Sequence, residues 1–209
     1  MAQDLRAHFN ANDQEKKVFD NKLIEALSRT PIWAPISLFF IIAGGLLYWG
    51  ISKSLLTIPQ TIVLFVAGWL LFSFIEYCMH RFLFHMPVTT KARETIQYNF
   101  HGVHHAFPKD KSRLAMPIPV SLTLCVFLFS LFYWVFFMGD NTFGFLPGVL
   151  SGYASYLFVH YLVHAYAPPQ GFGRSLWVNH AIHHYKDDKV VFGVSSQLWD
   201  HIFGTMPKK

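Results

Sequence analysis

Apolar residues gather in four long stretches along this chain, and polar residues occupy the connections between them. A transmembrane helix needs roughly 20 predominantly apolar residues. Four stretches meet that requirement: residues 32–51, 61–79, 118–137 and 145–165. The short connections "SKSLLTIP" and "MGDNTFG" leave room only for turns. The pattern therefore predicts two helical hairpins, and with them an all-α integral membrane protein with four transmembrane helices.

Lysine and arginine are distributed very unevenly around these stretches. Of the 17 basic residues, only Lys53 lies in the two short turns, and the other sixteen lie before the first stretch, between the second and third, or after the fourth. Basic residues accumulate in cytoplasmic loops. We therefore expect both termini, the loop 80–117 and the tail 166–209 to be cytosolic, in a multi-pass membrane protein.

The first 31 residues differ from the rest of the chain. They contain no apolar core followed by a small-residue cleavage site, so no cleaved signal peptide is expected. Residues 14–28 place Phe19, Leu23 and Leu27 at helical spacing among charges, which favours a helix on the membrane surface that ends before Pro31. We predict a cytosolic or interfacial segment at 1–31 and a single membrane domain at 32–209.

Composition supports a membrane protein and excludes some partners. The chain is 53% apolar and only 14% charged, and its formal net charge of +5 is explained by the cytosolic loops. No nucleic-acid partner is expected, because membrane topology and contact with lipid headgroups explain the excess of basic residues. The two cysteines, Cys78 and Cys125, both fall inside apolar stretches and indicate no disulfide. The oligomeric state stays open.

Histidine provides the candidate chemistry. Ten of the twelve histidines fall in the four clusters "HRFLFH", "HGVHH", "HYLVH" and "NHAIHH", all on the predicted cytosolic side. These ten are His80, His85, His101, His104, His105, His160, His164, His180, His183 and His184. Residues three and four apart share one face of a helix, so three of the clusters can each point their rings the same way.

The cluster "HRFLFH" does not fit this geometry. Five residues of a regular helix rotate by roughly 140°, which would turn His85 away from His80. Both rings can reach one site only if the helix ends or kinks near Leu83, and Pro87 favours such an ending. We predict a break there.

So many imidazoles at one membrane depth indicate metal binding. Buried neutral rings each need partners, and protonated rings would repel one another. Neutral imidazole is the commonest metal ligand in proteins. Ten ligands exceed what one ion takes, but serve two ions with about five each and leave a position free on each. The ligand type alone is compatible with iron, zinc, copper or nickel.

Four other residues are candidates for supporting roles. Glu76 lies one turn before His80 and is predicted to hold an imidazole N–H group, and a carboxylate near the interface paired with Arg81 or another base is the alternative. Tyr156, one turn before His160, is predicted to contact a substrate headgroup, and a plain interfacial tyrosine is the alternative. Asp200 in "LWDHIFGT" is a candidate for orienting a histidine, and Arg113 in "KSRLAMP" for meeting a headgroup or phosphate.

These stretches resemble the fatty acid hydroxylase and sterol desaturase superfamily of integral membrane di-iron enzymes. The resemblance covers most of residues 60–205 and rests on the four histidine clusters. The flanks "FPKDKSRLAMP" and "FGVSSQLWDHIFGT" are similar to those of the fatty acid 2-hydroxylases of sphingolipid metabolism. The resemblance implies that the ten histidines hold two iron ions in a cytosolic helical cap, with zinc as an alternative occupant of the purified protein.

The resemblance also implies an activity and partners. The expected reaction is hydroxylation of carbon 2 of a long acyl chain, of a fatty acid or a sphingolipid, with dioxygen as co-substrate. Relatives often carry a cytochrome domain before the membrane domain, so for this chain we expect a separate electron-donor protein. The expected location is a bacterial inner membrane or the endoplasmic reticulum.

Two alternatives remain open at this point. The same superfamily includes enzymes that oxidise sterols, carotenoids or alkanes. A metal transporter or storage protein would also bind metal through histidine, although transport ligands normally lie along a path near the bilayer midplane. All four clusters here lie at one end of the predicted spans.

Overall fold

A computed structural model of the chain describes residues 20–208, and within them it contains helices and no strand. The chain divides into two compact units. We call residues Thr30–Ile75 and Ala115–Phe158 the span unit, and the remainder, which carries all ten predicted ligands, the histidine unit. Each unit is described by itself.

Long apolar helices make up the span unit. They are α3 (Trp33–Ser52), most of α4 (Ile58–Cys78), α7 (Ile118–Ser130) with its π-helical extension η4 (Leu131–Val135), the short η5 (Gly139–Asn141), and most of α8 (Thr142–Ala165). Four helices are long and apolar enough to cross a membrane, which confirms the all-α, multi-pass prediction. Which side of the membrane the termini occupy stays a prediction, as does the division of the chain at residue 31.

Two of the predicted span boundaries differ by about one helical turn. Helix α4 begins at Ile58 rather than at residue 61, because Thr57 and Gln60 bond each other reciprocally and cap it. The Thr57 N–H group donates to Oε1 of Gln60 over 3.0 Å, and the Gln60 N–H group donates to the Thr57 hydroxyl over 3.4 Å. Helix α8 begins at Thr142 rather than at residue 145.

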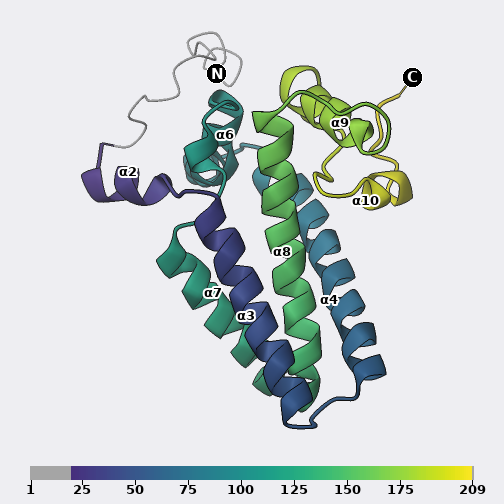
Figure 1. Cartoon of the computed structure of the whole chain (residues 1–209). Helices are drawn as coiled ribbons and strands as arrows, with labels where there is room; N and C mark the ends of the chain where they lie inside the picture. The colour runs from purple at the N-terminus through teal and green to yellow at the C-terminus, as the bar shows by residue number, and fades with distance from the viewer. Residues whose placement is uncertain (1–19, 209) are drawn as a thin grey trace. The chain divides into compact units, whose positions relative to one another are not determined.

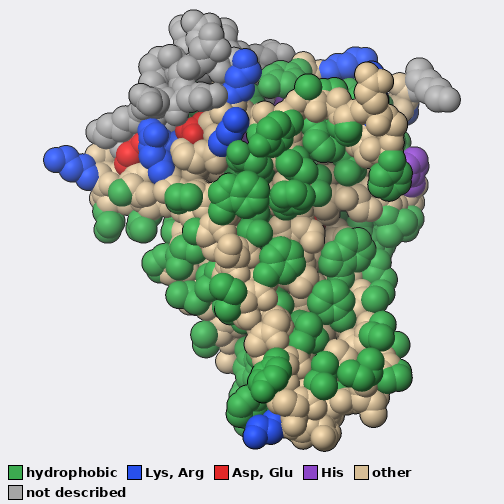
Figure 2. Space-filling view, in the orientation of Figure 1, with side chains coloured by type: hydrophobic (Ala, Val, Ile, Leu, Met, Phe, Trp, Pro, Cys, Tyr) green, Lys and Arg blue, Asp and Glu red, His purple; other side chains and the backbone are tan. Residues whose placement is uncertain are grey.

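Helix α8 is the central helix of the span unit (Figure 1). In its apolar window 61% of the residues are buried, against 17 to 28% for the other three. The rings of Phe39 on α3 and Phe72 on α4 both pack on Tyr153 of α8, and Phe132 of η4 packs on Phe145. The other helices expose large apolar side chains, as Figure 2 shows on the visible face, and lipid can cover these.

Glycine allows α4 and α8 to approach closely. A Cβ atom added at Gly148 would lie 2.0 Å from the backbone oxygen of Phe65, and one at Gly68 would lie 2.1 Å from that of Phe145. Small residues at such crossings let helix backbones come together in a membrane, where van der Waals packing drives association. These two glycines therefore fix the separation of the two helices that continue into the histidine unit.

The histidine unit is built from short helices. They are α2 (Lys22–Ser28), η1 (Met79–Phe84), α5 (Lys91–Gln97), η2 (Tyr98–Gly102), α6 (Val103–Ala106), η3 (Lys111–Arg113), the end of α8, α9 (Arg174–Tyr185) and α10 (Leu198–Ile202). Helix α2 exposes Leu23 and Leu27, and its place at a membrane surface stays a prediction. The earlier part of the predicted 14–28 helix, residues 14–19, lies outside the described residues.

Candidate metal centre

The ten predicted histidines converge in two groups of five. In each group the ligand nitrogens all lie within 4.8 Å of one another. The first histidine group consists of His80, His85, His101, His105 and His183. The second histidine group consists of His104, His160, His164, His180 and His184. All ten belong to the histidine unit.

Each H-x-x-H-H cluster is shared between the two groups. The loop cluster gives His101 and His105 to the first group and His104 to the second. In the tail cluster on α9, His183 belongs to the first group, whereas His180 and His184 belong to the second. Residues four apart point the same way and the third points to a neighbouring position, so one short helix serves two sites.

The break predicted in "HRFLFH" is present, and a π-helical turn produces it. Residues Met79–Phe84 form η1, and the helix ends at His85, whose N–H group donates to the carbonyl of His80 over 3.2 Å. A bond between residues five apart closes a wider turn than in an α-helix. His80 and His85 therefore return to nearly the same face, and both enter the first group. Helix α8 needs no such adjustment, because His160 and His164 are four apart.

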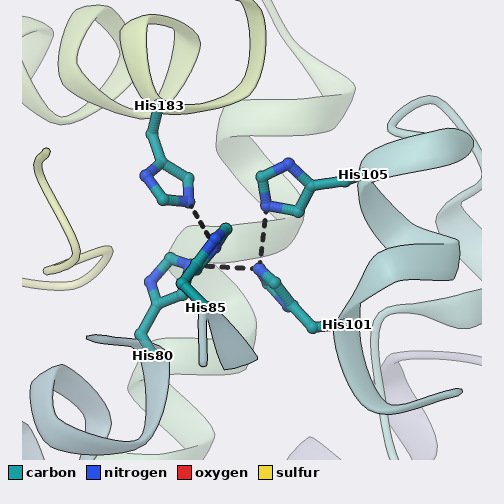
Figure 3. Close-up of side chains that lie close together, drawn as sticks. All are labelled: His80, His85, His101, His105 and His183. Carbon is teal, nitrogen blue, oxygen red and sulfur yellow. Dashed lines mark hydrogen bonds between the residues drawn. The ribbon is translucent and has the colours of Figure 1, made fainter. Parts of the chain in front are cut away.

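The ring nitrogens of the first group face one another from separate helical segments (Figure 3). Nε2 of His101 lies 3.0 Å from Nε2 of His80 and 2.9 Å from Nε2 of His105. The second group repeats the arrangement, with Nε2 atoms of His160 and His104 3.0 Å apart. Two nitrogens bound at right angles to one ion, each at about 2.1 Å, would be about 3 Å apart. The donor set therefore fits an ion in each group.

Burial keeps these rings neutral, as metal ligands must be. Desolvation, followed by the charge of neighbouring rings, holds the pKa values of His101, His104, His180 and His184 well below their usual range. Both ring nitrogens of His184 lack a hydrogen-bond partner among the described residues, and so does Nδ1 of His104. An ion bound at His184 would satisfy one of these buried nitrogens.

Backbone carbonyls fix two rings of the first group. The Nδ1–H group of His80 donates to the carbonyl of Phe192 over 2.5 Å, and that of His183 donates to the carbonyl of Val190 over 2.8 Å. Each bond leaves the Nε2 lone pair directed at the other histidines. The sequence did not predict these two partners. Every residue has a backbone carbonyl, and no side chain indicates which carbonyls accept a hydrogen bond from a histidine ring.

Glu76 supports this arrangement in a different way from the one expected. Its carboxylate accepts the backbone N–H groups of Val194 and Ser195 over 2.7 and 2.9 Å, and it also accepts the Ser195 hydroxyl. The hydrogen-bond partners of Glu76 are thus in the loop that follows Phe192 and are not imidazoles. Glu76 therefore reaches His80 only through that loop.

Asp200 accepts hydrogen bonds from other backbone N–H groups of the same loop. Its Oδ1 accepts the N–H group of Phe192 over 2.9 Å, and its Oδ2 accepts that of Gly193 over 2.8 Å. The Thr205 hydroxyl also donates to Asp200, over 2.6 Å. Asp200 thus orients the backbone that meets His80, a histidine of η1, and its role in orienting a tail histidine stays a prediction.

Arg113 forms ion pairs inside the histidine unit. Its side chain is only 4% exposed, and it pairs with Glu25 over 2.6 Å and with Asp110 over 2.9 Å. It also donates to the hydroxyl of Ser28. Because both carboxylates neutralise it, Arg113 anchors α2 to the loop before α7. Its contact with a headgroup or phosphate stays a prediction.

Tyr156 lies on α8 in the span unit, half-buried beside the rings of Phe72 and Tyr153. These ring contacts match the plain aromatic alternative. Its contact with a substrate headgroup stays a prediction.

A cavity of about 110 Å³ lies beside the second histidine group. His164, His180 and His184 form part of its wall, and Lys109, Trp177 and Tyr185 form another part. None of the first group's histidines lines this cavity. The second group therefore borders this cavity through three of its five rings.

Comparison with known proteins agrees with the geometry. The family model for fatty acid hydroxylase matches residues 65–205, a range that includes all ten histidines. This chain belongs to the fatty acid hydroxylase family. A solved structure of full-length scs7p, in which only the hydroxylase domain is visible, matches with a TM-score of 0.79 and 31% identity, over 91% of this chain and 71% of that one.

Curated members of the family are similar over nearly the whole chain. A dihydroceramide fatty acyl 2-hydroxylase of Arabidopsis thaliana is 32% identical over 91% of this chain and 80% of its own length. The ceramide very long chain fatty acid hydroxylase scs7 of Schizosaccharomyces pombe is 35% identical over 87% of this chain, but the chain spans only 52% of that protein. The fatty acid 2-hydroxylase of Mus musculus is likewise matched over 56% of its length.

Proposed function

We propose that this family member is a membrane monooxygenase that hydroxylates carbon 2 of a long-chain acyl group, in a fatty acid or a sphingolipid. The observation that carries the proposal is the pair of five-histidine groups within a chain of this family. The names of its relatives, which act on fatty acids, ceramide and dihydroceramide, support the substrate class.

The proposed cofactors are two iron ions, one in each histidine group. Bound iron would supply the dioxygen chemistry that side chains lack, since oxidation of an unactivated C–H bond exceeds acid and base catalysis. One atom of dioxygen enters the C–H bond and the other leaves as water, so the reaction consumes two electrons and two protons. We propose that a separate donor protein delivers the electrons.

The chain's own residues prepare the site in three ways. Burial keeps the imidazoles uncharged, and the carbonyls of Val190 and Phe192 hold two of them with Nε2 turned inward. An all-imidazole ligand set also resists oxidation better than thiolates would.

The position of the ligands along the chain fits a substrate with a headgroup. His80 and His85 follow the end of α4, and His160 and His164 lie in the last two turns of α8. An acyl chain whose tail stays in lipid would bring the carbon next to its headgroup to the ends of these spans. Carbon 2 is such a carbon. A cavity borders the second group.

Lipid mass spectrometry tests the proposal. Cells that produce the intact protein should accumulate 2-hydroxy acyl chains, and cells that produce the His180→Ala variant in equal amount should not. A matched control is His201→Ala, because His201 is exposed and belongs to neither group. Oxidised sterols, carotenoids or alkanes in place of 2-hydroxy acyl chains would overturn the substrate assignment.

A further inference from the structure

The two histidine groups contain the same number of rings but are supported differently. In the first group, the Nδ1–H groups of His80 and His183 donate to the carbonyls of Phe192 and Val190. In the second group, Nδ1 of His104 and Nδ1 of His184 have no hydrogen-bond partner among the described residues, and each ring is only 6% exposed. Two rings of the first group thus have backbone carbonyl partners that fix their orientation.

Both supporting carbonyls belong to one loop, residues 190–195, which is held in an unfavourable conformation. Val191 has a φ of 54°, in the left-handed region that a β-branched residue rarely adopts. At Gly193 an added Cβ would lie 2.0 Å from the backbone oxygen of Ser196. Such a conformation persists only where surrounding contacts over-determine it.

Two buried carboxylates supply those contacts. Asp200 is fully buried and accepts two loop N–H groups, from Phe192 and Gly193. Glu76, 7% exposed, accepts the next two, from Val194 and Ser195. Four consecutive backbone N–H groups are thus bound by two side chains, and this fixes the direction of the Phe192 carbonyl toward His80.

We propose that the loop 190–195 is a clamp that makes the first histidine group retain its metal ion more strongly than the second, with Asp200 and Glu76 as its positioning residues. This inference rests on the proposed function in one respect, since it takes both groups to be metal sites. Partners of this kind are worth roughly 10- to 100-fold in metal affinity.

Metal release from the intact purified protein in detergent tests the inference. A chelator is added, and the ions remaining per chain are measured over time by mass spectrometry. Two ions should leave in two steps that differ by roughly 10-fold or more in rate. His184→Ala should keep the slowly released ion, and His183→Ala should keep the rapidly released one, which assigns each step to a group.

Asp200→Ala should abolish the slow step and leave the fast step unchanged. A general loss of structure would instead change the rates of both steps. An effect on the slow step alone therefore shows that Asp200 positions the loop and is not merely needed for folding. The matched control is Asp140→Asn, because Asp140 is an exposed carboxylate that belongs to the span unit and to neither histidine group. If Asp200→Ala does not accumulate, Asp200→Asn carries the test, since its carbonyl still accepts the Phe192 N–H group, and it should give an intermediate slow step.

Three results would overturn the clamp: a single step in the wild-type protein, a slow step that survives in His183→Ala, or an Asp200 variant that releases both ions at wild-type rates. Failure of the proposed function looks different. In that case no 2-hydroxy acyl chains form although the two release steps and their assignment remain.

Discussion

The two histidine groups form a comparison within one molecule. Each has five rings and draws them from a span end, from the 101–105 cluster and from α9. The first group requires a π-helical turn to admit His85, and a loop held by two carboxylates to orient His80 and His183. The second group uses regular helical spacing at His160 and His164 and borders a cavity. Similar ligand sets can thus be assembled with very different amounts of support.

Removal of a ligand should have the largest effect, and it should be equally severe in both groups. His80→Ala and His160→Ala should each lower 2-hydroxylation by more than roughly 100-fold, because even the outer partner of a ligand is worth up to about that much. Each variant should also lose about one ion per chain. Product measured by lipid mass spectrometry, together with metal per chain, checks this. Wild-type values for both in either variant would remove that residue from the ligand set.

Alanine substitutions at two glycines separate the effect of the clamp on metal retention from the effect of helix packing in the span unit on stability. Gly193→Ala and Gly148→Ala each place a Cβ 2.0 Å from a backbone oxygen, so each should destabilise the protein by about 1–3 kcal/mol or more. Only Gly193→Ala should also lose the slowly released ion, because its strain falls on the loop that orients His80. Thermal unfolding and metal per chain in the folded fraction give the two readouts. Equal metal loss in both variants would mean that the clamp has no special role.

Substitutions at Glu76 refine the comparison further. Glu76→Gln keeps a carbonyl oxygen for the Val194 and Ser195 N–H groups, and its amide can donate to the Ser195 hydroxyl. It should release metal nearly as the wild type does, whereas Glu76→Ala should speed the slow step several-fold. Chelator time courses on the two variants measure this. A large loss in Glu76→Gln would instead point to a direct role of the negative charge.

Arg113 should have the smallest effect on either metal group. Arg113→Ala leaves Glu25 and Asp110 without their shared cation, so we expect a loss of about 3 kcal/mol in stability. The KM for the acyl substrate and the metal content should remain unchanged. Unfolding curves and substrate titrations check the two parts. A several-fold rise in KM without a loss of stability would support the headgroup contact.

Much of this architecture could be predicted from the sequence. The four spans follow from length and apolarity, which a bilayer imposes directly. The ten convergent histidines follow from helical spacing, and the misfit of "HRFLFH" with that spacing located the break before His85. Local geometry was sufficient in these cases.

The remainder depends on contacts between residues far apart in the chain. The division of His101, His104 and His105 between two groups is decided by where α8 and α9 lie, which spacing does not encode. Glu76 was predicted to face an imidazole because it lies one turn before His80, yet its carboxylate bonds to a loop 118 residues later. The carbonyls of Val190 and Phe192 carry no sequence signal at all.

Anomalous diffraction from crystals of the intact protein tests the central claim most directly. Two metal peaks are predicted, one within bonding distance of the Nε2 atoms of His80 and His183, and one within bonding distance of those of His160 and His180. A single peak shared between the two groups, or peaks away from both, would contradict the account.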